Sequence, residues 1–89
     1  MSAPRDKQIR LSLHASGYLE RRGFTEAEVD ETIRDSDWLP TRQDRLEAAK
    51  DFPYDGEWNG RHYSTKRVRA IFVEEADEIV VVTIYTYFY

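Results

Sequence analysis

Residues 79–89 read IVVVTIYTYFY, and every side chain in this stretch is β-branched or aromatic. The stretch contains no charge, glycine or proline, which favours a strand over a helix. Alternation along a strand predicts one core face, made of Val80, Val82, Ile84, Thr86 and Phe88. The opposite face starts apolar and ends in hydroxyl and phenol groups. Because so apolar a strand would promote aggregation at a sheet edge, we expect it to lie inside a sheet.

The chain has 89 residues, of which 40% are hydrophobic, enough for one core. We expect a loose N-terminus over residues 1–7 and a single domain over residues 8–89. The sequence has no cysteine, so disulfides, thiolate metal sites and cysteine nucleophiles are excluded. His14 and His62 lie far apart, and we expect neither a metal nor a cofactor. We also find no signal peptide and no apolar stretch of membrane-spanning length, so we expect a cytoplasmic protein with no membrane partner.

Charge is unevenly distributed along the chain, although the net charge is −4. Residues 5–22 carry five cations against two acids, and residues 55–69 carry four cations against two acids. Residues 26–37 carry six acids against one arginine. This pattern predicts a polarised surface, with the acids lying on solvated faces or at a hairpin tip.

The first half of the chain predicts one strand and two helices. Residues 8–13 alternate as a half-buried strand does. Residues 13–22 then change to a helical period, which places His14, Tyr18 and Arg22 along one stripe. Gly23 is expected to end this helix in the left-handed conformation. A second helix should begin with Thr25 and Glu28 as a capping box and end near residue 35.

The second half predicts three strands. Residues 41–54 fit either a helix or a strand, and we choose the strand. Residues 53–61 are expected to form a loop, with Trp38, Trp58 and His62 in loop packing. Residues 64–74 alternate as a strand with Val68, Ala70 and Phe72 on one face, and residues 75–78 form a hairpin tip. The result is an α+β fold in the order β-α-α-β-β-β, with two helices on one face of a twisted antiparallel sheet and a partly open opposite face.

Residues spread over almost the whole chain resemble the bacterial family of domains of unknown function numbered 4258. They are His14-Ala15, Leu19, Arg22-Gly23-Phe24-Thr25, Val29, Ile33, residues 48–53 and 57–60, Val68-Arg69 and residues 80–85. This family has been grouped with the RelE and ParE toxins and with barnase-like and colicin-like nucleases. The resemblance therefore implies a RelE-like, microbial RNase-like fold. One departure is Tyr18, which stands where family members often have arginine.

The expected activity is metal-independent endoribonuclease cleavage of the toxin type. Cleavage needs a group that takes the 2′-hydroxyl proton, a group that protonates the leaving oxygen, and cations beside the phosphate. We expect His14, Arg22 and Tyr85 to be catalytic, because an imidazole exchanges protons near neutral pH and a guanidinium binds phosphate oxygens. The expected substrate-binding residues are Lys50, Lys66, Arg69, Thr83 and Tyr87.

A second hypothesis is a small binding or regulatory module that acts through protein contacts or homodimerisation. Under it, His14 is a structural polar group, Arg22 complements a helix terminus, and the tyrosines form a contact surface. Expected partners are RNA, an acidic antitoxin protein that covers residues 61–69, or a second copy of the chain.

Overall fold

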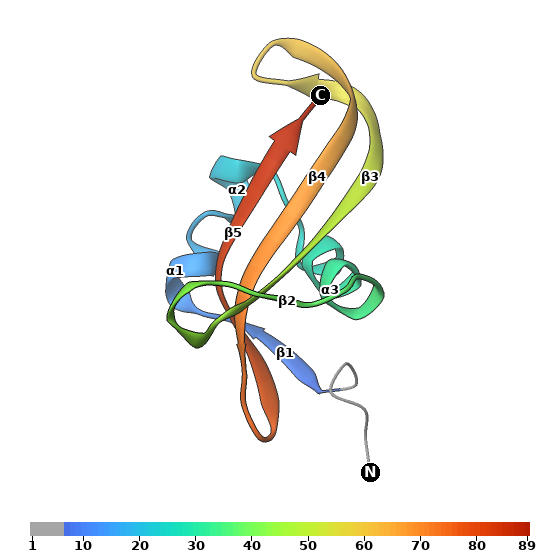
Figure 1. Ribbon diagram of the computed structural model, residues 1–89. Helices are drawn as coiled ribbons and strands as arrows, with labels where there is room; N and C mark the ends of the chain where they lie inside the picture. Colours follow the sequence, from blue (N-terminus) through green and yellow to red (C-terminus); the bar gives the residue numbers. More distant parts are fainter. Residues whose placement is uncertain (1–6) are drawn as a thin grey trace.

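The computed structural model describes residues 7–89, which form an α+β fold around a five-stranded sheet (Figure 1). The elements, in chain order, are β1 (Gln8–Leu11), α1 (Leu13–Ser16), α2 (Leu19–Arg22), α3 (Glu26–Asp35), β2 (Leu39–Pro40), the 3-10 turn η2 (Arg42–Asp44), β3 (Leu46–Trp58), β4 (Arg61–Glu74) and β5 (Glu78–Phe88). The expected loose terminus falls mostly on residues 1–6, outside the described residues. No helix within residues 7–89 has the length and apolar character that crossing a bilayer requires.

The sheet has the strand order β1-β5-β4-β3-β2. β1 pairs with β5 in parallel, whereas the other three pairings are antiparallel. The sheet is therefore mixed, and the prediction of a wholly antiparallel sheet is wrong. The alternation of residues 8–13 predicted a strand, but alternation carries no information about strand direction. As expected, β5 is internal over its first residues, between β1 and β4.

The outer edge of β5 is covered by α2 after β1 has ended. Arg22 Nη1 donates a hydrogen bond to the Ile84 carbonyl over 2.6 Å, and the Thr86 hydroxyl donates to the Arg22 carbonyl. These side-chain bonds occupy edge positions that another strand could otherwise use. The apolar β5 is therefore protected along both of its sides.

A β-bulge in β5 changes which residues face the core. Phe72 pairs with Val81 and Ile71 pairs with Thr83, so Val82 is an extra residue without a partner in β4. Ile79 and Val81 are fully buried before the bulge, and Ile84 is fully buried after it. The predicted core face is thus correct from Ile84 onward and wrong before it, because one inserted residue reverses the alternation.

The helices lie on one face of the sheet, with α1 and α2 beside β5 and α3 over β3 and β4 (Figure 1). The expected helix over residues 13–22 is instead two single turns, separated at Gly17 and Tyr18. Gly23 ends α2 with a φ of 70°, as predicted. α3 begins with the predicted capping box between Thr25 and Glu28 and ends at Asp35.

β3 and β4 form a long hairpin. Of the ambiguous residues 41–54, those from 46 to 54 belong to β3, as chosen, whereas residues 42–44 form η2 and the strand prediction is wrong there. β3 also continues to Trp58, where a loop was expected. The chain turns at Asn59 and Gly60, both with positive φ. Trp58 and His62 accordingly lie in strands and not in a loop, and the Trp58 ring stacks on Phe88 with 4.8 Å between centroids.

The core lies between the helices and one face of the sheet. Val68, Ala70 and Phe72 of β4 are fully buried on this face, as predicted. The remaining core residues are Ala15, Phe24, Val29, Ile33, Ala48, Ile79, Val81 and Ile84. The opposite, open face of the sheet carries Arg67 and Arg69 of β4 and the residues of β5 that pair with them, Tyr87 and Tyr85.

Candidate functional site

His14, Tyr18 and Arg22 stay neighbours although the helix between them is broken. The Ser12 side chain caps α1 by accepting a hydrogen bond from the Ala15 amide, and the Ser12 amide is bonded to the Val81 carbonyl. α1 is therefore fixed against β5. The His14 and Tyr18 rings then meet edge to face, with 4.9 Å between centroids and 76° between planes. The predicted stripe is confirmed, with His14 exposed to solvent.

The guanidinium of Arg22 lies between two phenol rings. Its central carbon is 3.8 Å from the Tyr18 ring centroid and 5.0 Å from that of Tyr85. Nη1 donates to the Ile84 carbonyl. Cation–π contacts on two sides and one backbone bond fix the orientation of this side chain, while other N–H groups of its five stay available to donate.

Arg69 continues the row on the far side of Tyr85. Its guanidinium carbon lies 5.5 Å from the Tyr85 ring centroid. Arg69 Nε also donates to Glu47 Oε2 over 2.7 Å, and this hydrogen bond is the main reason that the pKa of Arg69 is raised. We call His14, Tyr18, Arg22, Tyr85 and Arg69 the His–Arg row. Arg69 enters it already neutralised by a carboxylate.

The structure brings together six of the eight site residues predicted from the sequence. His14, Arg22, Tyr85 and Arg69 belong to the His–Arg row. Thr83 and Tyr87 lie on the same open face of the sheet, where they pair with Ile71 and Arg67 of β4. The Tyr87 side chain is 45% exposed.

Lys50 does not join the His–Arg row. It lies on the helix-covered face of β3, where its Nζ is 2.8 Å from Glu31 and 3.0 Å from Asp35 of α3. The two carboxylates raise the pKa of Lys50, chiefly through the hydrogen bond to Glu31. Lys50 therefore ties α3 to the sheet on the face opposite Tyr85.

Lys66 is also on the helix-covered face and is only 6% exposed. Its Nζ donates to the Gly23 carbonyl over 2.9 Å and to Glu28 Oε1 over 2.7 Å. Glu28 is the capping-box acid of α3. Lys66 thus joins β4 to the end of α2 and the start of α3, and it has no access to a ligand on the open face.

The end of the open face is crossed by Tyr89. Its hydroxyl donates to Asp51 Oδ2 over 2.5 Å, and Arg67 Nε donates to Asp51 Oδ1 over 2.6 Å. These two bonds lower the pKa of Asp51, the one to Arg67 more strongly, and the bond to Asp51 raises the pKa of Tyr89. Because Asp51 is on β3, the Tyr89 ring lies across β4, where Arg67 is 5.8 Å from its centroid.

The predicted basic strip over residues 61–69 is largely neutralised within the protein. Lys66, Arg67 and Arg69 each have a carboxylate partner. Within residues 7–89, Arg21 and Arg22 form no ion pair, and both lie at the end of α2 beside Tyr18. Beside His14 there are therefore two arginines without an ion pair, whereas Arg67 and Arg69, which pair with Tyr87 and Tyr85, are neutralised.

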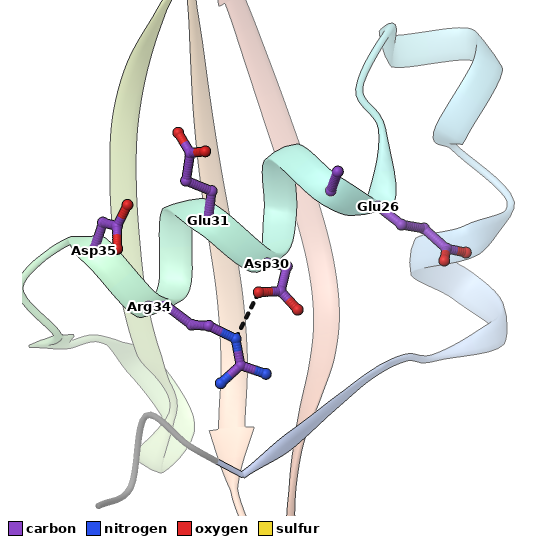
Figure 2. A pocket seen from close by; sticks show the side chains of 6 residues that line it. Glu26, Asp30, Glu31, Arg34 and Asp35 are labelled. Carbon is purple, nitrogen blue, oxygen red and sulfur yellow. Dashed lines mark hydrogen bonds and ion pairs between the residues drawn. The ribbon is translucent and has the colours of Figure 1, made fainter.

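An open depression lies on the outer side of α3, where Glu26, Asp30, Glu31, Arg34 and Asp35 project from the helix (Figure 2). Arg34 is ion-paired with Asp30 over 2.5 Å. None of the residues that line this depression belongs to the His–Arg row. Its carboxylates are those of the acidic segment seen in the sequence, and they form a solvated helix face.

The His–Arg row could bind a phosphate and exchange a proton beside it. It provides an exposed imidazole, an oriented guanidinium and a phenol within one set of contacts. The spacing of four residues on either side of Tyr18 predicted that it lies on one stripe with His14 and Arg22. Sequence reasoning nevertheless treated Tyr18 as a departure from a family pattern and gave its ring no part in the site. Within the described part of the chain, no group of acidic or histidine side chains is arranged to hold a metal ion.

No model of a known protein family matches the chain, and neither curated proteins nor solved structures give a significant match. The family resemblance therefore depends on the residues quoted from the sequence.

Proposed function

We propose that the protein is a metal-independent endoribonuclease of the toxin type. The observation that carries the proposal is the His–Arg row, in which the Arg22 guanidinium is held between Tyr18 and Tyr85 and Tyr18 contacts His14. Arg22 has no carboxylate competitor among the described residues, so it can bind the charge that develops on a phosphate. Lys50 and Lys66 have no part in the proposed site.

In the proposed reaction, neutral His14 accepts the proton of a 2′-hydroxyl group as its oxygen attacks the adjacent phosphorus. Arg22 donates hydrogen bonds to the non-bridging oxygens, which gain charge as the new bond forms. The Tyr85 phenol donates a proton to the 5′-oxygen as the phosphorus–oxygen bond breaks. The products are a 2′,3′-cyclic phosphate and a free 5′-hydroxyl, and no metal takes part in any step.

The test is cleavage of a single-stranded RNA by the purified protein in the presence of EDTA. We expect His14→Ala to reduce the rate by about a hundredfold or more. His62→Ala is the matched control, since His62 is exposed on the long hairpin and contacts Asp55. Equal rates for wild type and His14→Ala, or no cleavage by the wild type in EDTA, would contradict the proposal.

Arg22 is tested in the same assay by its replacement with alanine and with lysine. Alanine removes both the charge and the contacts with two rings, whereas lysine keeps the charge only. We expect strong loss for Arg22→Ala and incomplete recovery for Arg22→Lys. Arg42→Ala, an exposed arginine of η2 without an ion pair among residues 7–89, should leave the rate unchanged. Induced expression of the wild-type gene should arrest bacterial growth, whereas induced expression of the His14→Ala gene should not.

A second candidate is a non-catalytic module that binds protein, and one observation favours it. Leu13 is 92% exposed directly beside His14, and Tyr85, Tyr87 and Tyr89 are exposed on the neighbouring sheet face. Tyrosine and arginine side chains are enriched at protein interfaces, and the exposed leucine adds apolar area beside them. If this candidate is correct and the partner is a second copy, Leu13→Ser should convert a dimer into a monomer in analytical ultracentrifugation. An inhibitory protein partner would bind beside Arg21 and Arg22, where the unpaired charge lies.

A further inference from the structure

The tyrosines of the open face form a second feature, of which the proposed reaction uses only Tyr85. Tyr85, Tyr87 and Tyr89 alternate along the end of β5 and are 38%, 45% and 53% exposed. Residues two apart on a strand are separated by about 6.6 Å, so the Tyr85 and Tyr87 side chains leave β5 one such step apart. Exposed aromatic rings in this arrangement are available as stacking surfaces.

One of the three rings, that of Tyr89, is held across the sheet by a hydrogen bond at its hydroxyl. The Tyr89 side chain starts beyond β5 and its hydroxyl reaches Asp51 of β3, so the ring spans β4 above Arg67. A ring held at both ends cannot turn away when a planar group arrives. The Tyr89 side chain therefore loses little conformational entropy when a base stacks on it.

The net charge around the tyrosines differs between the two sides of the open face. On the α2 side, Arg21 and Arg22 form no ion pair with any residue between 7 and 89. On the β3 side, Glu47 and Asp51 are carboxylates paired with Arg69 and Arg67, so the charges there cancel. A polyanion is therefore attracted at the α2 side and gains little from the neutral ion pairs at the β3 side.

We infer that the open face binds a single strand of RNA, with its bases on Tyr87 and Tyr89 and its phosphates along the α2 side. This inference deepens the proposed function, on which it rests for the choice of RNA, by naming the form of the substrate. The base next to Tyr85 then has its phosphate at Arg22 and its ribose toward His14. A duplex does not fit this surface, because its base faces are already stacked and its recognition depends on backbone contacts.

The experiment measures the fluorescence anisotropy of a labelled, short 2′-O-methyl oligonucleotide, which lacks the attacking hydroxyl and cannot be cleaved. We expect Tyr87→Leu and Tyr89→Leu each to weaken binding by about fivefold to a hundredfold, which is the range found for loss of one base–aromatic stack. Tyr87→Phe keeps the ring and should bind as the wild type does. A duplex of the same sequence should bind at least tenfold more weakly than the single strand. Circular dichroism confirms that each variant is folded.

Several results would overturn the inference. They are no binding by the wild type, equal affinity for single strand and duplex, or leucine variants that bind as well as the wild type. A dimer that becomes a monomer in Tyr87→Leu, without any RNA binding, would assign the tyrosines to self-association.

The two proposals can fail separately. If the uncleavable strand binds through Tyr87 but no RNA is cleaved in EDTA, the inference stands and the proposed reaction is wrong. If RNA is cleaved and Tyr87→Leu changes neither cleavage nor binding, the reaction stands and the inference is wrong.

Discussion

Gly23 illustrates how much a single residue decides in this protein. It ends α2 with a φ of 70°, and a Cβ atom added there would lie 2.6 Å from the Trp58 ring. Gly60 has a φ of 79° with no heavy atom within 4 Å of the added Cβ, so it isolates the backbone effect. Alanine at Gly60 should cost about 1 kcal/mol. Gly23→Ala should cost about 1–3 kcal/mol more, because Trp58 must also move. Urea denaturation of both variants measures this difference in the free energy of unfolding. Equal losses of stability would show that Trp58 moves aside without an energetic penalty.

Asp51 provides a residue-scale prediction about pH. Its pKa in the folded protein is below its ordinary value of 3.8, chiefly because Arg67 donates to it. A depressed folded-state pKa stabilises the protein above pH 3.8, and this stabilisation is lost as the pH falls through the lower folded value. Wild type should therefore exceed Asp51→Asn in stability at pH 7, with a gap that narrows below about pH 4. Urea midpoints at several pH values measure the gap, and a constant gap would contradict the assignment.

Single-residue chemistry predicted part of the candidate site. The spacing of four residues from His14 to Tyr18 and again from Tyr18 to Arg22 was sufficient to place the three together, because such residues meet here even across a broken helix. Lys50 and Lys66 were misplaced for a different reason. Alternation assigns Lys66 to the same face as Val68 and Lys50 to the same face as Ala48. It cannot show that α3 covers this face and places carboxylates within ion-pair distance of both ammonium groups.

At the scale of elements, α3 depends on Lys66. The ammonium group joins the carbonyl that ends α2 to the carboxylate of the α3 capping box, and it is almost completely buried. Lys66→Met keeps the aliphatic stem but leaves both oxygens without this donor, which should cost about 1–3 kcal/mol. Lys50→Met removes a more exposed ion pair and should cost less. Thermal denaturation compares the two, and neither variant should change RNA affinity. A large loss of affinity without loss of stability would return Lys66 to the binding site.

The bulge in β5 is the element that sequence patterns could not show. Residues 80–82 are three identical valines, so the composition gives no sign that one of them is unpaired. Deletion of Val82 would restore regular alternation and force either Ile79 and Val81 or Ile84 out of the core. Exposure of even one such side chain costs about 1.5–3 kcal/mol, so we expect marked destabilisation in urea denaturation. A neutral deletion would mean that the bulge moves freely along β5.

For the whole molecule, whose net charge is −4, we predict a weak dependence of RNA affinity on salt concentration. Among residues 7–89, the arginines on the α2 side of the tyrosines that form no ion pair are Arg21 and Arg22, so two phosphates should be neutralised on binding. The logarithm of the affinity should then fall against the logarithm of salt concentration with a slope of about −1.4. If Arg67 and Arg69 left their carboxylates to bind phosphates as well, the slope would be about −2.8. Anisotropy titrations at several salt concentrations distinguish the two values.

The fold class of the whole molecule could be predicted from the sequence, whereas the pairing of its strands could not. Patterns of residues 8–13, 64–74 and 79–89 predicted strands, and the capping box at Thr25 predicted the start of α3. The parallel neighbour of β5 and the length of the β3–β4 hairpin follow from contacts between distant residues. Local propensity predicts neither feature. Pro53 and Gly56, for example, favour a loop by residue type but are paired with β4 as part of β3.

The position of β5 in the sheet also governs when the protein can fold. Its neighbours are β1, about seventy residues earlier in the chain, and β4, so the first strand has no hydrogen-bonding partner until residues 78–88 have left the ribosome. Ser12, which fixes α1, and Arg22, which orients the row, both bond to carbonyls of this late segment. A nascent chain therefore cannot assemble the row that we propose to cut RNA before β5 has been synthesised.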